Sequence, residues 1–112
     1  MKDINQFITE KIKRFELTNN ERVSLIEIVG NATENIGEDD DINKYEEFRK
    51  DCYEDEINSL NDLYEMLEDT HTYPKITNRI MQQNELNALC KLLQYALDKN
   101  IVDLSDILEK II

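Results

Sequence analysis

The stretch from Asp41 to Thr70 constrains the fold most, because it contains no glycine and no proline. Its apolar residues recur at three- and four-residue spacing, which is the period of an amphipathic helix. They are Ile42, Tyr45, Phe48, Cys52, Tyr53, Ile57, Leu60, Leu63, Tyr64 and Leu67. We therefore expect one long central helix over residues 41–69.

The whole chain favours an all-α fold. It has two glycines and one proline in 112 residues and no clear β alternation. This length suits a single domain, residues 1–112, that buries a normal core. We predict a compact bundle of four to five helices around the long acidic one. The others are expected at about 4–15, 19–36 and 85–98 and from about 103 or 105 to the end, with a short helical piece near 76–81.

Local signals support several of these boundaries. Thr18 and Glu21 have the spacing of a capping box, and Gly37 suits the left-handed position that ends a helix. Gly30 lies inside the expected second helix, where glycine is unfavourable, so we expect a close helix crossing there. The terminal residues Ile111 and Ile112 are expected to pack into the core or against a second copy of the chain.

Negative charge is concentrated in residues 38–69. This segment holds fourteen carboxylates and three basic residues, a net charge of 3 − 14 = −11, whereas the whole chain carries −12. Direct binding to nucleic acid is disfavoured, because such proteins need a positive surface to displace counterions. The acids either fill an ordinary solvated helix face or form a surface for a basic partner.

If the acids bind a partner, a defined set of side chains should form the surface. Successive acids on the outer side of a 41–69 helix would extend about 33 Å from Glu47 to Asp69, at 1.5 Å of rise per residue. Three tyrosines near the edges of this row, Tyr53, Tyr64 and Tyr73, are candidate anchors, since tyrosine is common in interface hot spots. The predicted partner-binding residues are Asp39, Asp40, Asp41, Glu47, Asp51, Glu54, Asp55, Asp62, Glu65, Asp69, Tyr53 and Tyr64.

Two charged residues, Arg49 and Glu56, fall on the apolar side of the expected helix. Burying an unpaired charge is costly, and seven residues separate them, so they do not pair with each other in one helix. Either each meets a group on a neighbouring helix, or the helix is kinked or only partly covered near Tyr53–Glu56. A functional pocket around Glu56 is the other interpretation.

Metal chemistry is a less favoured hypothesis. Glu68-x-x-His71 has the spacing of the Glu-x-x-His unit of di-iron helix bundles, but the chain holds one histidine. The run Glu46-Glu47 with Asp51, Glu54 and Asp55 resembles the acidic helix pairs of all-helical nucleotide pyrophosphohydrolases, which hold Mg²⁺. The expected second acidic helix is missing, so a carboxylate-metal nucleotide hydrolase is a minor alternative, and we expect no metal and no cofactor.

The favoured hypothesis is a non-enzymatic acidic protein that binds and inhibits a basic partner. The partner would be a nucleic-acid-binding protein or nuclease, blocked by nucleic-acid mimicry, and complementary charge would speed association. In size and charge the chain resembles anti-CRISPR and other phage anti-defence proteins and nuclease-toxin immunity proteins. A structural or regulatory homodimer is the alternative. With no membrane span or signal-peptide core and two isolated cysteines, we expect a cytoplasmic protein with reduced thiols.

Overall fold

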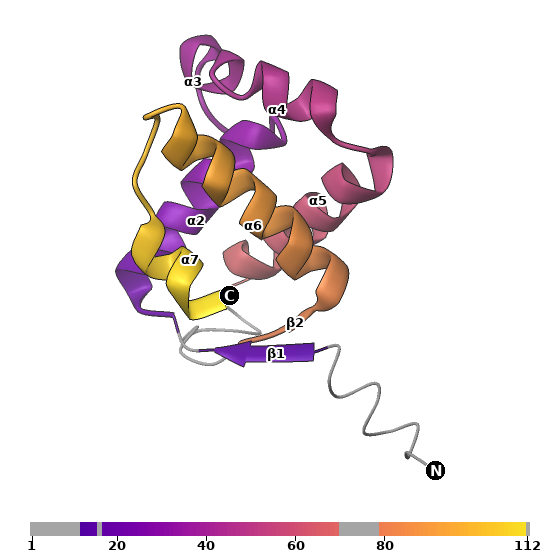
Figure 1. Cartoon of the computed structure of the whole chain (residues 1–112), viewed down its shortest axis with the longest axis vertical. Coiled ribbons are helices and arrows are strands. Elements are labelled where there is room, and N and C mark those ends of the chain that lie inside the picture. The colour runs from indigo at the N-terminus through magenta and orange to yellow at the C-terminus, as the bar shows by residue number, and fades with distance from the viewer. Residues whose placement is uncertain (1–11, 16, 70–78, 112) are drawn as a thin grey trace.

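The computed structural model describes residues 12–15, 17–69 and 79–111, and this part of the chain is a small helical bundle with one short pair of strands (Figure 1). The predicted all-α fold class is confirmed. The elements are β1 (Ile12–Phe15), α2 (Asn19–Ala32), α3 (Asp39–Asn43), α4 (Glu46–Asp51), α5 (Glu54–Glu68), β2 (Arg79–Gln82), α6 (Gln83–Asp98) and α7 (Ser105–Ile111).

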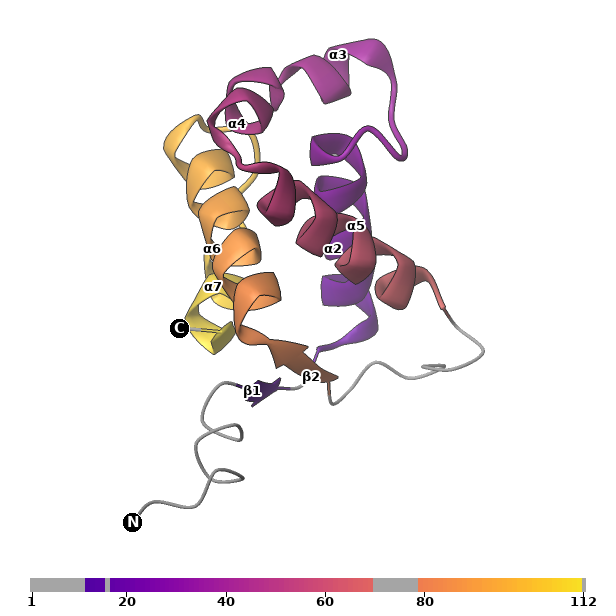
Figure 2. The same cartoon turned by 90° about the vertical axis from the view of Figure 1, so that its right-hand side faces the viewer.

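Four helices enclose the core. Helix α5 packs against both α2 and α6, and α7 packs against α6. The short helices α3 and α4 lie at one end of this group and the two strands lie at the opposite end (Figures 1 and 2). The acid-rich segment, residues 38–69, therefore contributes the core helix α5 and the two short helices α3 and α4 at one end of the bundle, rather than one long central helix.

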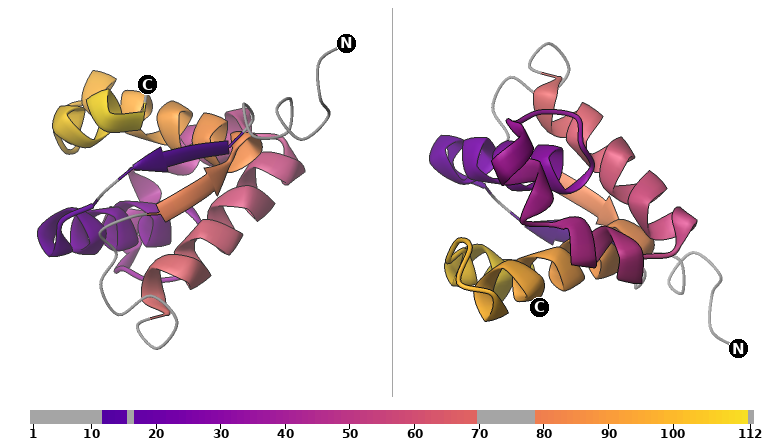
Figure 3. Two further views of the ribbon diagram at one scale, coloured as in Figure 1. Left: turned by 90° about the horizontal axis from the view of Figure 1, so that it is seen from below. Right: turned by 90° about the horizontal axis from the view of Figure 1, so that it is seen from above.

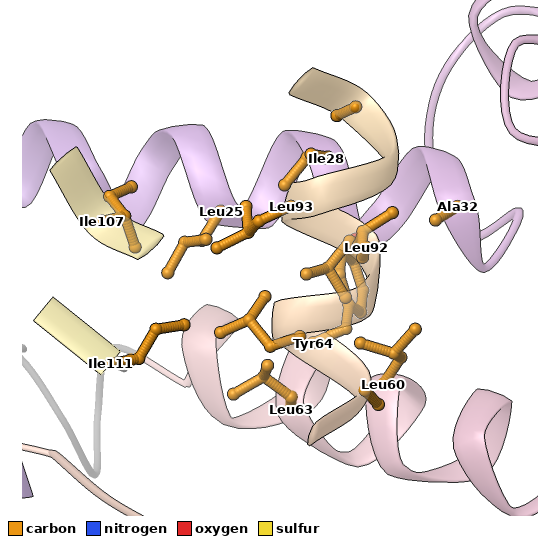
Figure 4. Packing of buried hydrophobic residues seen from close by; sticks show 14 of the residues in the cluster. Leu25, Ile28, Ala32, Leu60, Leu63, Tyr64, Leu92, Leu93, Ile107 and Ile111 are labelled. Atoms are coloured by element: carbon orange, nitrogen blue, oxygen red, sulfur yellow. The ribbon is translucent and has the colours of Figure 1, made fainter. Parts of the chain in front are cut away.

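The core is built from leucines at helical spacing. Leu25, Leu60, Leu63, Leu89 and Leu92 are each fully buried. Figure 4 shows how such side chains from α2, α5, α6 and α7 meet, with Ile107 and Ile111 entering from α7. Burying one aliphatic side chain of this size stabilises a fold by about 1.5–3 kcal/mol. The prediction that the C-terminal isoleucines enter the core is confirmed for Ile111, and Ile112 lies outside the described residues.

The continuous helix over residues 41–69 was a wrong prediction. A turn at Lys44 and Tyr45 separates α3 from α4, with Tyr45 departing from helical backbone angles, and a second break at Cys52 and Tyr53 separates α4 from α5. Both Cys52 and Tyr53 have extended backbone angles. The breaks let Tyr45 and Phe48 point inward to Tyr95 of α6, with ring centroids 6.1 and 5.6 Å from it.

Arg49 adds side-chain hydrogen bonds to carbonyl oxygens at the first break. Its guanidinium donates to the carbonyl oxygens of Asn31 and Ala32 at the end of α2, each at 3.2 Å, and to that of Ile42 in α3 at 2.9 Å. It also lies 3.3 Å from the Glu34 carboxylate. Carbonyls at helix ends have no partner within the helix, so this one side chain compensates for ending two helices.

Lys91 likewise contacts a carbonyl oxygen at the second break, between α4 and α5. Its ammonium on α6 donates to the carbonyl oxygen of Asp51, the last residue of α4, at 3.0 Å, and lies 3.3 Å from Oε1 of Glu56. The same Glu56 oxygen accepts from the backbone N–H of Tyr53 at 2.9 Å, as in a capping box. The predicted kink near Tyr53–Glu56 and the predicted partners for Arg49 and Glu56 are both confirmed.

The predicted first helix, residues 4–15, is wrong where it can be checked. Residues 12–15 form β1, which lies beside β2 (Figure 3) and pairs with it in antiparallel orientation. Ile12 lies opposite Gln82, and Phe15 lies opposite Arg79. The short helical piece near 76–81 is likewise a strand from Arg79. Cross-strand pairing between distant segments here outweighs helical periodicity. Residues 4–11 and 76–78 lie outside the described part of the chain.

Helix α2 begins at the predicted capping box but ends four residues earlier than expected. The Thr18 and Glu21 side chains each accept from the other's backbone N–H, at 3.1 and 2.8 Å. At the other end, Thr33 Oγ1 donates to the Val29 carbonyl at 2.7 Å, and Glu34, not Gly37, takes the left-handed position after the helix, with φ of 65°. The chain then folds back over Gly30.

Helix α5 approaches Gly30, as the predicted helix crossing requires, but the segment that follows α2 comes closer still. A Cβ atom at this position would overlap the Ile36 side chain and would lie 3.0 Å from Cε2 of Tyr64 on α5. The returning segment after α2 therefore makes the closest approach, and α5 adds to it.

Candidate functional site

The outer side of α5 keeps the acidic face that the sequence predicts. Glu54, Asp55, Asp62, Glu65 and Asp69 fall within an arc of about 100°, at 100° per residue. This α5 acidic face extends about 22 Å along the helix. The buried side chains of the same helix, from Ser59 to Leu67, occupy the opposite side.

Most carboxylates of this face are exposed and without a cation. Glu54, Asp55, Asp62 and Glu65 are exposed, and their side chains make no ion pair or hydrogen bond within the described residues. Asp69 is half-buried at the C-terminal cap of α5 and has an interaction of its own. The four exposed acids therefore present an uncompensated negative field, which a basic surface could neutralise.

The other predicted acids are distributed over α3 and α4. Asp39 and Asp40 are exposed in the first turn of α3, and Asp51 is exposed at the end of α4. Asp41 pairs with Lys44 and Glu47 pairs with Lys99, each at 3.5 Å. The helix breaks thus divide the single 33 Å row that we predicted into separate groups, and only the α5 group forms one helix face.

Of the three tyrosines predicted as anchors, Tyr53 and Tyr64 differ in exposure, and Tyr73 lies outside the described residues. Tyr53, between α4 and α5, is 79% exposed and stands beside Glu54, so it is available to a partner. Tyr64 is 7% exposed and lies in the core, so its prediction as an anchor was wrong. Burial raises the pKa of the Tyr64 phenol, and a hydrogen bond to Glu68 raises it further. The apolar period of α5 contained the signal for this outcome, since Tyr64 lies between Leu60 and Leu67.

Sequence reasoning missed a cavity between α2, α3 and the loop after α6. Its volume is about 200 Å³. Glu27 and Asn31 on α2 contribute to it although neither stood out in the sequence, because the lining comes from three segments far apart in the chain. The lining residues are Ser24, Glu27, Ile28, Asn31, Asp41, Lys44, Tyr45, Ile101 and Val102.

The two metal-binding patterns are not assembled in the part of the chain that is described. Residues 12–15, 17–69 and 79–111 contain no group of three His, Cys, Asp or Glu side chains that could hold a metal ion. His71 of the Glu68-x-x-His71 pattern lies outside these residues. Glu46 pairs with Lys50 at 3.3 Å, and the break at Cys52 separates Glu46 and Glu47 from Glu54 and Asp55.

Cys52 and Cys90 are both half-buried free thiols. Burial raises the pKa of the Cys52 thiol; Lys91 opposes this effect, and the Glu56 and Asp51 carboxylates add to it. None of the described helices combines the length and the apolar character required to cross a bilayer. Comparisons with protein-family models, curated proteins and solved structures found no significant match to this chain.

Proposed function

We propose that this protein is a non-enzymatic inhibitor that binds the basic, nucleic-acid-binding surface of another protein. The observation that carries the proposal is the α5 acidic face, where Glu54, Asp55, Asp62 and Glu65 are exposed and uncompensated within the described residues. A helix used only for solubility normally mixes signs, because like charges three or four residues apart destabilise it. Retaining one sign along the whole face fits selection for a cationic partner.

Tyr53 and the α3 acids extend this surface. The Tyr53 ring projects at the start of α5 and offers an apolar contact that charge alone lacks, in the manner of an interface hot spot. Asp39 and Asp40 add two exposed carboxylates at the end of the molecule formed by α3 and α4. Together they would occupy the sites where a partner binds phosphates, as anti-CRISPR and nuclease immunity proteins do by analogy of size and charge.

The homodimer is less favoured by the described surface. Val23, Ile36 and Tyr53 are its exposed large hydrophobic side chains and they lie on separate elements, while Ile107 and Ile111 are used inside the core. Stable homodimer interfaces are usually more apolar than this.

Charge reversal tests the proposal. The tagged protein is used at low salt to recover partners, and each recovered protein is tested for binding to a labelled oligonucleotide with and without the inhibitor. We expect wild-type protein to displace the oligonucleotide, less so at high salt, because exposed charges are screened over about 8–10 Å. The triple variant Asp55→Lys, Asp62→Lys, Glu65→Lys should lose this competition.

A matched variant separates the face from net charge. Asp98→Lys, Asp106→Lys and Glu109→Lys make the same change in charge at exposed positions of α6 and α7. This control should compete nearly as well as wild type. Equal loss in both variants, or recovery of nothing except the protein itself, would contradict the proposed mode of binding and direct attention to self-association, measured by sedimentation.

A further inference from the structure

The cavity between α2, α3 and the loop after α6 is large enough for the polar end of one side chain. Its volume of about 200 Å³ would hold about six waters, at about 30 Å³ each in the liquid. Sites for complete drug-sized ligands are larger, about 300–1,000 Å³. The cavity therefore suits the end of a side chain better than a nucleotide or cofactor.

Two buried polar groups in the lining have no partner in the described part of the chain. Asn31 is 8% exposed and Tyr45 is 2% exposed. Neither the Asn31 side-chain amide nor the Tyr45 hydroxyl makes a hydrogen bond to any residue within 12–15, 17–69 or 79–111. Buried polar side chains are nearly always hydrogen-bonded, so each of these two groups is expected to take a partner from outside the described residues, either a water molecule or a ligand group.

The charges of the lining favour a cation. Glu27 is exposed and has no cationic partner among the described residues. Asp41 lies 3.5 Å from Lys44, so these two largely compensate each other, and the lining has a net charge of −2 + 1 = −1. Burial, followed by Glu27 and Asp41, raises the pKa of Tyr45 to about 12. The phenol is thus protonated at neutral pH and can both accept and donate.

We propose that this cavity binds the guanidinium group of an arginine side chain. A guanidinium carries one permanent charge and five donors in a plane, so it can reach several acceptors at once. The Glu27 carboxylate and the Tyr45 hydroxyl oxygen belong to lining residues and offer acceptors, whereas Oδ1 of Asn31 lies against Gly37. The inference that the arginine belongs to a basic partner rests on the proposed function, whereas the site for the guanidinium does not.

The test uses a small probe in place of the partner. N-acetyl-arginine amide is titrated into the ¹⁵N-labelled protein, and the uncharged citrulline analogue and the lysine analogue serve as controls. We expect amide shifts confined to residues 24–31, 41–45 and 101–102, with arginine binding more tightly than lysine and citrulline not binding. Shifts spread over the α5 acidic face, or no shifts at tens of millimolar probe, would overturn the site.

Variants make the test specific. Glu27→Gln removes the charge and Tyr45→Phe removes the hydroxyl while keeping the ring, and each should weaken the arginine probe by about fivefold or more, the effect of one lost hydrogen bond. Glu109→Gln on α7 makes the same charge change at an exposed position outside the cavity and should leave affinity within about twofold. Equal weakening by Glu109→Gln would overturn the site. If wild-type protein binds the arginine probe in the cavity but binds no basic partner, the proposed function fails and the guanidinium site stands.

Discussion

The Nζ atom of Lys91 lies 3.3 Å from Oε1 of Glu56 and thereby joins the middle of α6 to the first turn of α5. The same ammonium donates to the Asp51 carbonyl at 3.0 Å. One cation thus holds both sides of the break between α4 and α5. This arrangement orients α5, and hence the α5 acidic face, relative to α4.

Replacing Lys91 should destabilise the fold measurably. Lys91→Met keeps the aliphatic stem but removes both contacts, and we expect the free energy of unfolding to fall by about 1–2 kcal/mol. Urea denaturation followed by circular dichroism measures it. Lys50→Met, which removes the exposed pair with Glu46, is the control and should change stability by less than about 0.5 kcal/mol. Equal effects would show that Lys91 acts only as a surface charge.

Arg49 should be more sensitive, because it caps two helices. Arg49→Lys keeps the charge but cannot reach the three carbonyls with one ammonium in the same geometry, so we expect a loss of about 2 kcal/mol, and Arg49→Met should cost about 3 kcal/mol. The same unfolding experiment applies. A lysine variant as stable as wild type would mean that the Glu34 pair, not the carbonyl contacts, matters.

Glu56 should contribute stability that acid removes. Its pKa is lowered from 4.5, first by the Tyr53 backbone N–H and, against an opposing effect of burial, also by Lys91. The folded state therefore favours the ionised form, and its stabilisation is present above about pH 4.5 and lost as pH falls through the lowered value. We expect the difference in unfolding free energy between wild type and Glu56→Gln to be constant from pH 7 to about 5 and to shrink below.

This comparison cancels the general effect of protonating other acids, which relieves repulsion in both proteins. Glutamine can still accept from the Tyr53 N–H, so the difference reports the charge. Glu65→Gln is the control, since the Glu65 side chain has no partner among the described residues. The difference in unfolding free energy between wild type and Glu65→Gln should be small and should not shrink below pH 5 in the same way. A difference for Glu56→Gln that stays unchanged down to pH 3 would contradict the assignment.

Gly30 should not tolerate a methyl group. Alanine favours a helix by about 1 kcal/mol over glycine, but its Cβ would overlap Ile36 and crowd Tyr64, and we expect Gly30→Ala to destabilise by about 1–2 kcal/mol overall. Ile36→Ala removes the closest obstacle, so the double variant should recover part of the loss. If Gly30→Ala stabilised the protein, the Ile36 side chain would have moved away from the new methyl group at little cost.

Local patterns predicted the elements whose boundaries are set locally. Helix α2 begins at its capping box, and α6 and α7 lie within about two residues of the bounds predicted for them. The acidic face of α5 was also predictable, since residues on one side of a helix share a fixed spacing. Glu54, Asp55, Asp62 and Glu65 are all exposed as expected.

Most of the wrong or missing predictions depend on contacts between segments that are distant in the chain. The period of residues 41–69 is helical throughout. At its breaks the carbonyl oxygens receive side-chain partners: Ile42 of α3 from Arg49, 7 residues away, and Asp51 of α4 from Lys91, 40 residues away. Strand β1 depends on β2, which no local signal near Ile12 reveals. The cavity around Asn31 and Tyr45 required knowing which loop covers α2. Single-residue patterns carry none of this information.

The antiparallel pairing of β1 with β2 has a consequence for the order of folding. Ile12 and Gln82 are 82 − 12 = 70 residues apart in the chain, whereas α6 and α7 adjoin each other in sequence. Closing a long loop costs more entropy than forming local contacts and slows folding. We expect the helices to assemble first and the strands to join last, so that the rate of folding is set by the return of the N-terminal segment to the start of α6.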